Sequence, residues 1–223
     1  MIISHSKKFI FFACGKTGTT SIEGILKQYH DGDVLFGLIR EKAAEIPGHI
    51  PKHARPEMVK ECIPEEVWNE YFKFVFVRNP WDWVVSQYYF ANFKKKKLDH
   101  FTNKIHRRHV EKVWWRRVTN NPYDSCESLM QHAYVYDRKG EKLPDFIGCY
   151  ERLQEDFDQI CRYLNIPCVV LPVKNTTTHK PYRELYTWRG RKRVARLYEK
   201  DIQLLGYGFN QTPDRDSLNP CWS

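Results

Sequence analysis

Residues 8–28 read KFIFFACGKTGTTSIEGILKQ, and this stretch decides how the rest of the chain is interpreted. Its first part, residues 9–14, is an apolar run rich in aromatic and branched side chains, which is typical of a buried parallel strand. A small polar loop follows, and apolar side chains then recur at helical spacing at Ile22, Ile25 and Leu26. The stretch therefore predicts a strand, a loop and a helix.

The loop between this strand and helix, residues 15–21, is rich in glycine, hydroxyl groups and positive charge. A loop at this place directs several backbone N–H groups and the N-terminus of the helix at one point. Lys16 adds a full positive charge, and Thr17, Thr19, Thr20 and Ser21 supply hydroxyl groups around Gly18. We expect the loop to bind a phosphate or a sulfate. On these residues alone, an ordinary strand-to-helix turn with a hydroxyl N-cap is the alternative.

The loop is not a Walker A phosphate-binding loop. The pattern G-x-x-x-x-G-K-[ST] requires a glycine five residues before Gly15, and Ile10 stands there. An NTPase would also need an aspartate at the end of a second apolar strand, where it helps to hold magnesium.

A second motif, residues 71–90, reads YFKFVFVRNPWDWVVSQYYF. Residues 72–77 form another buried-strand pattern, and Pro80 suits the first position of the helix that follows. Arg78 then lies at the carboxyl end of the strand, and Ser86 lies about two turns along the helix. Ligands of open α/β sheets bind beyond the carboxyl ends of the strands, so both motifs are expected to face one crevice.

The residues at this second strand end suit a phosphate group better than a metal ion. The guanidinium of Arg78 is a fork-shaped donor for phosphate oxygens, and the hydroxyl of Ser86 can donate to the same group. No acidic metal ligand follows the strand directly, and the cysteines show no zinc-binding spacing. The sequence therefore predicts a nucleotide held by cations and amides, without a metal site.

The two motifs together, KTGTTS at 16–21 and RNPWDWVVS at 78–86, resemble the sulfotransferases that use 3′-phosphoadenosine 5′-phosphosulfate. The similarity is to the branch of carbohydrate sulfotransferases and their small bacterial relatives. KHA at 52–54, DFIGCYERLQEDF at 145–157 and HKPYRELY at 179–186 agree with the family's order. The resemblance implies a P-loop-like α/β fold, with a central parallel sheet in a three-layer α/β/α arrangement.

The resemblance also implies roles for individual residues. The residues that would bind the phosphosulfate cosubstrate are Lys16, Thr17, Gly18, Thr19, Thr20, Ser21, Arg78, Ser86, Tyr150 and Lys180. Lys16 would also assist the transfer, Tyr150 would lie near the adenine, and Lys180 would cover the nucleotide or meet the acceptor. A nucleophilic hydroxyl needs a base with a pKa near neutrality, and His53 matches the family's element; His49 is the reserve candidate.

Length and composition fit one folded domain over residues 1–223. The chain is 42% hydrophobic and 15% aromatic, which excludes an intrinsically disordered protein. No apolar run reaches the ~18 residues of a membrane helix, and the first strand leaves no room for a signal peptide. Seven cysteines without paired spacing favour reduced thiols. We therefore expect a cytoplasmic protein without a transmembrane segment; its oligomeric state stays open.

Residues 94–117 carry most of the positive charge of the chain. They hold ten Lys and Arg against Asp99 and Glu111, a balance of +8 in a chain of +9. Such a segment suits an anionic glycan, a lipid headgroup or a nucleic acid, or it is simply a solvated helical face. We expect an inserted, acceptor-facing helical segment.

The remaining segments give weaker structural expectations. Residues 31–55 are punctuated by glycine and proline and predict irregular structure. One or two short helices are expected over 56–70, and one amphipathic helix over 189–205. The residues after Phe209 are expected to wrap over the surface.

The sequence and its family resemblance thus favour sulfuryl transfer to an acceptor hydroxyl of a carbohydrate or glycolipid. A deviant P-loop nucleotide kinase is one alternative, but it would require a magnesium site. A non-catalytic nucleic-acid-binding protein is the other. That function explains the basic segment but gives no role to Lys16, Arg78 and Ser86.

Overall fold

The computed structural model describes residues 1–45, 51–92, 130–174, 180–220 and 222. Within these residues the sheet has the strand order β1 (Ile2–Ser4), β2 (Phe9–Phe12), β3 (Phe72–Val77) and β4 (Phe146–Cys149). Strands β2, β3 and β4 are parallel, and β1 pairs antiparallel with β2 at one edge. Strands β2 and β3 lie where the sequence predicts strands, whereas β1 is an addition.

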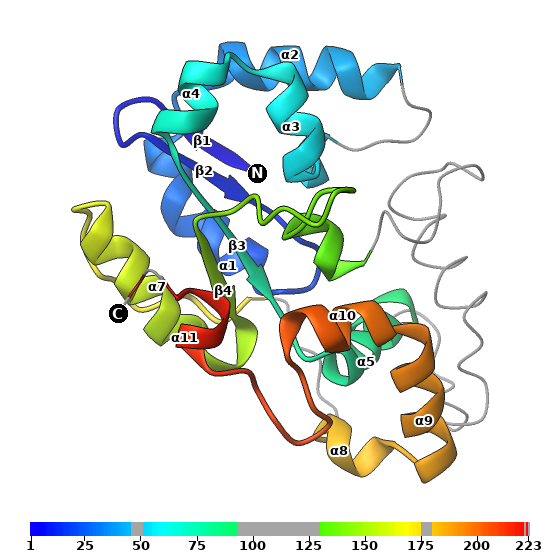
Figure 1. Cartoon of the computed structure of the whole chain (residues 1–223). Helices are drawn as coiled ribbons and strands as arrows, with labels where there is room; N and C mark the ends of the chain where they lie inside the picture. The colour runs from blue at the N-terminus through cyan, green and yellow to red at the C-terminus, as the bar shows by residue number, and fades with distance from the viewer. Residues whose placement is uncertain (46–50, 93–129, 175–179, 221, 223) are drawn as a thin grey trace.

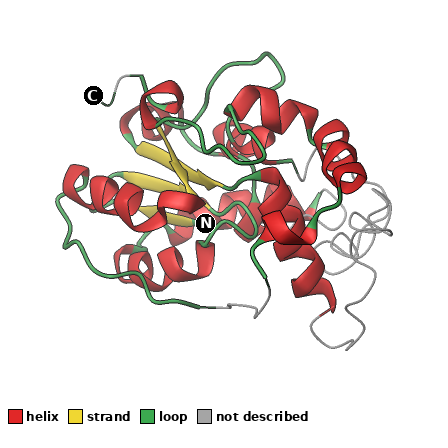
Figure 2. Cartoon of the chain, turned by 90° about the horizontal axis from the view of Figure 1, so that it is seen from below, coloured by secondary structure: helices red, strands yellow, loops and turns green. Residues whose placement is uncertain are grey.

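The described helices are α1 (Thr19–Leu26), α2 (Asp33–Ala44), α3 (Pro56–Cys62), α4 (Glu65–Glu70), α5 (Pro80–Asn92), α7 (Leu153–Tyr163), α8 (Tyr182–Leu185), α9 (Trp188–Leu197), α10 (Glu199–Leu205) and α11 (Arg215–Leu218). Short 3₁₀ helices include Pro51–His53, Gln131–Tyr134 and Tyr150–Arg152. Helices cover both faces of the sheet (Figures 1 and 2).

Alternate residues of the strands pack into two separate cores, as the two-residue period of a strand requires. Ile10 and Val75 lie on the face covered by α2 and α3, whereas Phe11 and Phe74 lie on the face covered by α1 and α7. Every residue of β2, β3 and β4 is buried. The α/β fold with helices on both sides of a largely parallel sheet is confirmed.

The expectation of irregular structure over residues 31–55 is wrong, because α2 occupies much of this segment. Leu35 and Ile39 stand four residues apart, and both are buried in the core beneath the helix. This tertiary contact stabilises the helix although Gly37 lies inside it. The two short helices expected over 56–70 are present as α3 and α4.

The amphipathic segment 189–205 forms two helices instead of one. Helix α9 ends before Tyr198, whose backbone leaves helical geometry, and α10 starts directly afterwards. The Tyr198 side chain is buried and its ring meets that of Trp83 edge-on, with centroids 5.7 Å apart. Val194 of α9 packs in the cluster that contains Trp83, whereas Leu205 of α10 packs in the core beneath α2 and α3.

The residues after Phe209 are anchored to the sheet and do not simply wrap over the surface. The amide of Asn219 accepts from the Ile147 N–H at 2.8 Å and donates to the Ile147 carbonyl at 2.9 Å. These bonds satisfy a backbone N–H and a backbone C=O of β4, which is the last strand in the order of the described sheet. Arg215 also pairs with the buried Asp156 at 2.6 Å. Long-range polar contacts thus fix this segment.

Two predictions concern residues that lie outside the described ranges. The basic segment 94–117 is one, and the reserve base His49 is the other. Among the described helices, none has both the length and the apolar character that crossing a bilayer requires.

Candidate active site

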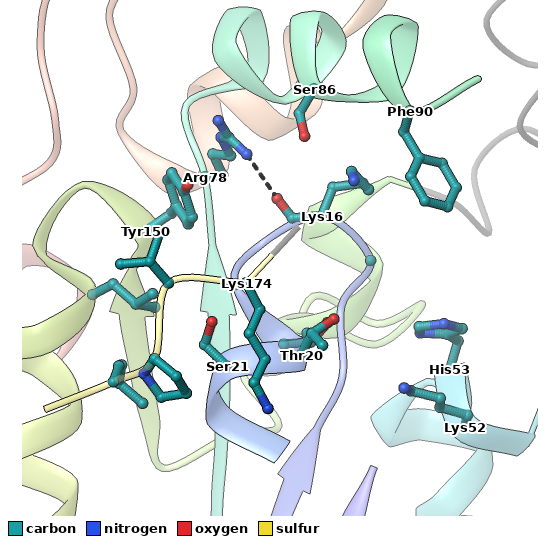
Figure 3. Close-up of a pocket in the computed structure, with 17 residues that line it drawn as sticks. Lys16, Thr20, Ser21, Lys52, His53, Arg78, Ser86, Phe90, Tyr150 and Lys174 are labelled. Carbon is teal, nitrogen blue, oxygen red and sulfur yellow. Dashed lines mark hydrogen bonds between the residues drawn. The ribbon is translucent and has the colours of Figure 1, made fainter. Parts of the chain in front are cut away.

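The loop between β2 and α1 is held from outside through its carbonyl groups. Trp83 Nε1 donates to the Gly15 carbonyl at 2.8 Å. Arg78 Nη1 donates to the Lys16 carbonyl at 3.1 Å (Figure 3). Both donors come from the second motif, at the end of β3 and on α5. The first turn of a helix leaves backbone N–H groups without intrahelical partners. The loop is therefore fixed while the N-terminus of α1 stays available for an anion.

Gly18 caps α1 in a conformation that favours glycine. Its φ is +81°, and a Cβ built there would lie 2.7 Å from Leu153 Cδ2. Leu153 begins α7 and also lines the cavity into which the loop opens. A side chain at this position would have to displace the end of the Leu153 side chain and adopt a left-handed backbone conformation.

We expect Gly18→Ala to destabilise the protein more than Gly140→Ala. Gly140 has nearly the same φ, +84°, but nothing lies within 4 Å of the place that a Cβ would take there. The left-handed backbone costs about 1–2 kcal/mol in both variants, and the clash with Leu153 adds about 1–3 kcal/mol in the first. Urea unfolding of both variants measures the difference. Equal losses would show that contact with α7 does not constrain the loop.

The loop opens into a cavity of about 430 Å³. Most of the predicted site residues line it: Lys16, Gly18, Thr19, Thr20, Ser21, His53, Arg78, Ser86 and Tyr150. They come from the first loop, the 3₁₀ helix at Pro51–His53, the end of β3, helix α5 and the end of β4. The structure thus brings together residues that are far apart in the sequence.

Two predicted residues do not line the cavity. The Thr17 side chain is buried beneath the loop, where its hydroxyl donates to the Cys14 carbonyl at 2.8 Å. The Thr17 hydroxyl therefore stabilises the loop through this bond and is not directed at a ligand. Lys180 is exposed and lies outside the lining.

The cavity is strongly cationic. Lys16, Lys52, Arg78 and Lys174 line it, and none of the described lining residues is Asp or Glu. Burial and the nearby charge of Arg78 lower the pKa of Lys16 to about 8. Its Nζ lies 4.1 Å from the centroid of the Phe90 ring, within the range of a cation–π contact.

Arg78 is held in place on three sides. Its Nε and Nη2 both lie 2.8 Å from Oδ2 of Asp82, and its Nη1 donates to the Lys16 carbonyl. The Tyr150 ring packs against the guanidinium, with Cζ 3.9 Å from the ring centroid. These contacts fix the orientation of the Arg78 guanidinium before any ligand binds. They leave one N–H on Nη1 and one on Nη2 for an anion.

His53 is held as a neutral imidazole with one basic nitrogen. Its Nδ1 lies 2.7 Å from the Ala13 carbonyl, which can only accept, so Nδ1 carries the proton and Nε2 is the acceptor. Burial lowers the pKa of His53 below its usual value, and the bond to Ala13 opposes this only in part. The Tyr134 hydroxyl donates to the His53 carbonyl at 2.8 Å and fixes the backbone.

The side of the cavity opposite His53 is apolar (Figure 3). It is formed by Tyr150, Leu153 and residues 171–173. Gln154 anchors that last segment, because its Oε1 accepts from the Leu171 N–H at 2.8 Å. The cavity therefore joins an apolar, aromatic end to a basic end that holds an imidazole.

Sequence reasoning missed several lining residues, among them Lys52, Phe90 and Lys174. Phe90 follows Ser86 by four residues, so helical spacing alone places the two side chains on the same face of α5. Lys52 precedes His53, and its Nζ pairs with Oε2 of Glu23 at 2.6 Å. Lys174 reaches the cavity because its segment passes α1, where a Cβ on Gly24 would lie 3.0 Å from the lysine Nζ. No local sequence pattern predicts that passage.

A cationic cavity at the carboxyl edge of a parallel sheet is the kind of site at which α/β proteins bind anionic ligands. No group of three His, Cys, Asp or Glu placed to hold a metal ion is found in the described part of the chain. Residues 1–208 match the model of the Sulfotransferase family. The chain belongs to this family, and the membership supports sulfuryl transfer as its activity.

Two individual proteins are similar to this chain. An uncharacterized protein of Archaeoglobus fulgidus is 27% identical over 128 residues, which is 57% of this chain and 96% of the relative. The crystal structure of a sulfotransferase from Alicyclobacillus acidocaldarius is 15% identical, with a TM-score of 0.32. That similarity covers 91% of this chain and 81% of the other.

Proposed function

We propose that the protein transfers a sulfuryl group from 3′-phosphoadenosine 5′-phosphosulfate to a hydroxyl of a carbohydrate or glycolipid. The observation that carries this proposal is the cavity, which combines cations and hydroxyl groups with an apolar end and has no carboxylate among its described lining residues. Its volume of about 430 Å³ lies within the ~300–1,000 Å³ usual for small-molecule sites.

The lining residues fit the chemical parts of this cosubstrate. The loop around Lys16 and the first turn of α1 suit the phosphosulfate group, because N–H groups, hydroxyls and an ammonium meet there. Arg78 and Ser86 suit the 3′-phosphate. Tyr150 and the apolar residues beside it suit the adenine. Lys174, which adds a further cation, would then contact the nucleotide in place of Lys180.

The chain's own residues would act on the acceptor proton and on the developing charge. When bound, the cosubstrate supplies an activated sulfuryl group and leaves as 3′,5′-ADP. His53 Nε2 takes the proton of the acceptor hydroxyl, because Nδ1 is already bonded to Ala13. The ammonium of Lys16 neutralises the negative charge that grows on the oxygen of the departing nucleotide.

We expect 3′,5′-ADP to stabilise the protein in the presence of excess EDTA. At 100 times its dissociation constant, the nucleotide should add ~2.7 kcal/mol to the free energy of unfolding. AMP, which lacks the 3′-phosphate, leaves Arg78 and Ser86 without that partner and should bind more weakly. Thermal unfolding with each ligand measures this. Stabilisation by ATP with magnesium, but not by 3′,5′-ADP, would indicate a nucleotide kinase instead.

The acceptor class has a direct test of its own. Incubation with radiolabelled phosphosulfate donor and a panel of glycans and glycolipids should transfer label to at least one of them. Label found only on phenols or proteins would contradict a carbohydrate acceptor and leave the donor assignment intact.

A further inference from the structure

One face of α9 is cationic throughout. Arg189, Lys192, Arg193 and Arg196 are exposed and follow the spacing i, i+3, i+4, i+7, which places them on one side of the helix. Trp188, at the first position of the same helix, is 64% exposed. We call these five residues the α9 face.

The orientation of α9 is fixed by its opposite side. Gly190 and Val194 are buried, and Trp81 Nε1 donates to the Arg191 carbonyl at 3.0 Å. Helix α9 lies at the edge of the molecule (Figure 1). The α9 face is therefore directed away from the core, and none of its residues lines the catalytic cavity.

The charges of the α9 face disfavour the isolated helix. Helix α9 contains no Asp or Glu, and like charges three or four residues apart repel each other. Basic residues in its first turn also oppose the positive end of the helix dipole. An external anionic surface offsets both effects, because it places negative charge along the whole face.

The tryptophan indicates which kind of anionic surface this is. Arg189 Cζ and Lys192 Nζ lie 5.6 Å and 5.0 Å from the centroid of the Trp188 ring, so the ring and the cations form one unit. Tryptophan side chains concentrate at the level of lipid headgroups, and arginine binds phosphate oxygens. We propose that the α9 face docks the protein on a membrane surface rich in anionic phospholipids.

The number of cationic side chains on the α9 face predicts how strongly it contributes to vesicle binding. A lysine or arginine near an anionic bilayer contributes roughly a fivefold gain in binding, so four of them together give several hundredfold. We expect the variant Arg189→Gln/Lys192→Gln/Arg193→Gln/Arg196→Gln to lose at least about 100-fold in partitioning to anionic vesicles. Trp188→Ala should lose less, and added salt should weaken binding of the wild type.

The experiment is co-sedimentation of the full chain with phosphatidylcholine vesicles that contain or lack phosphatidylglycerol. A matched control, Lys27→Gln/Arg40→Gln/Lys139→Gln/Arg162→Gln, removes the same charge from other exposed positions and should bind nearly as the wild type does. Lys16→Ala should bind vesicles normally, so the result is independent of sulfuryl transfer.

Several results would overturn the proposal. The wild type could fail to sediment with the anionic vesicles, or the control variant could lose as much binding as the α9 variant. Binding to duplex DNA or to a sulfated polysaccharide, without binding to vesicles, would assign the α9 face to a different polyanion. If the fourfold α9 variant does not fold, Trp188→Ala decides: unchanged partitioning of that variant contradicts the membrane assignment.

Discussion

Replacement of His53 by alanine should lower turnover about 10²–10⁴-fold, the usual contribution of a positioned general base. The acceptor hydroxyl is a poor nucleophile at neutral pH, and His53 is the imidazole that lines the cavity with Nε2 as its acceptor nitrogen. The affinity for 3′,5′-ADP should stay close to that of the wild type, because we propose that the imidazole acts on the acceptor and not on the nucleotide. Steady-state kinetics and nucleotide titration separate the two quantities.

Three further variants separate the base from the loop that holds it. His53→Asn retains a donor for the Ala13 carbonyl but has no base, so it should lose about as much turnover as His53→Ala. Tyr134→Phe removes the bond to the His53 carbonyl, which costs about 0.5–1.5 kcal/mol of stability, and should leave turnover near that of the wild type. His49→Ala should cost much less than His53→Ala. If these two effects are reversed, His49 is the base; if neither loses activity, the proton leaves by another route.

Strands β2 and β3 and the helices that follow them could be predicted because their patterns are local. The run from Phe72 to Val77 is apolar over nearly its whole length and ends in Arg78, Asn79 and Pro80, so both the strand and the start of α5 are evident. Strand β1 has only three residues, too few to show a period. Its pairing with β2 is a tertiary contact that the residue pattern of such a short segment does not predict.

The candidate site also contains residues that local sequence patterns predict and residues that they do not. The ends of β2 and β3 lie at one edge of the sheet because the strands are parallel, so Lys16, Arg78 and Ser86 could be expected to meet. His53 was placed by the family resemblance, and its bond to the Ala13 carbonyl connects segments 40 residues apart. Such a bond has no signature in either segment.

The role of Asp82 shows what the sequence alone could not decide. Its position four residues after Arg78 is evident, but the spacing alone does not show which group the carboxylate contacts. In the structure it pairs with the guanidinium of Arg78 and does not line the cavity. The side-chain geometry, and not the spacing, shows that Asp82 pairs with Arg78.

Lys16→Ala should mainly lower turnover, by about 10²–10³-fold, because the charge that we propose Lys16 neutralises grows only toward the transition state. Arg78→Ala should mainly weaken nucleotide binding, because the 3′-phosphate is present before and after transfer. Comparison of turnover with the dissociation constant of 3′,5′-ADP in both variants tests this division. If both variants only raised the KM for the donor, the proposed role of Lys16 would be wrong.

The pH dependence of kcat/KM for the donor should identify Lys16 independently. In the free enzyme its pKa is about 8, so kcat/KM should fall as the pH rises through this value and the ammonium is lost. On the acid side, protonation of His53 should reduce activity only below its usual pKa of about 6.5, because burial lowers the pKa of this imidazole. Lys16→Arg keeps its charge, so its alkaline limb should move to well above pH 8 even if its rate is lower. An alkaline limb that stays near pH 8 in Lys16→Arg would show that another group titrates there.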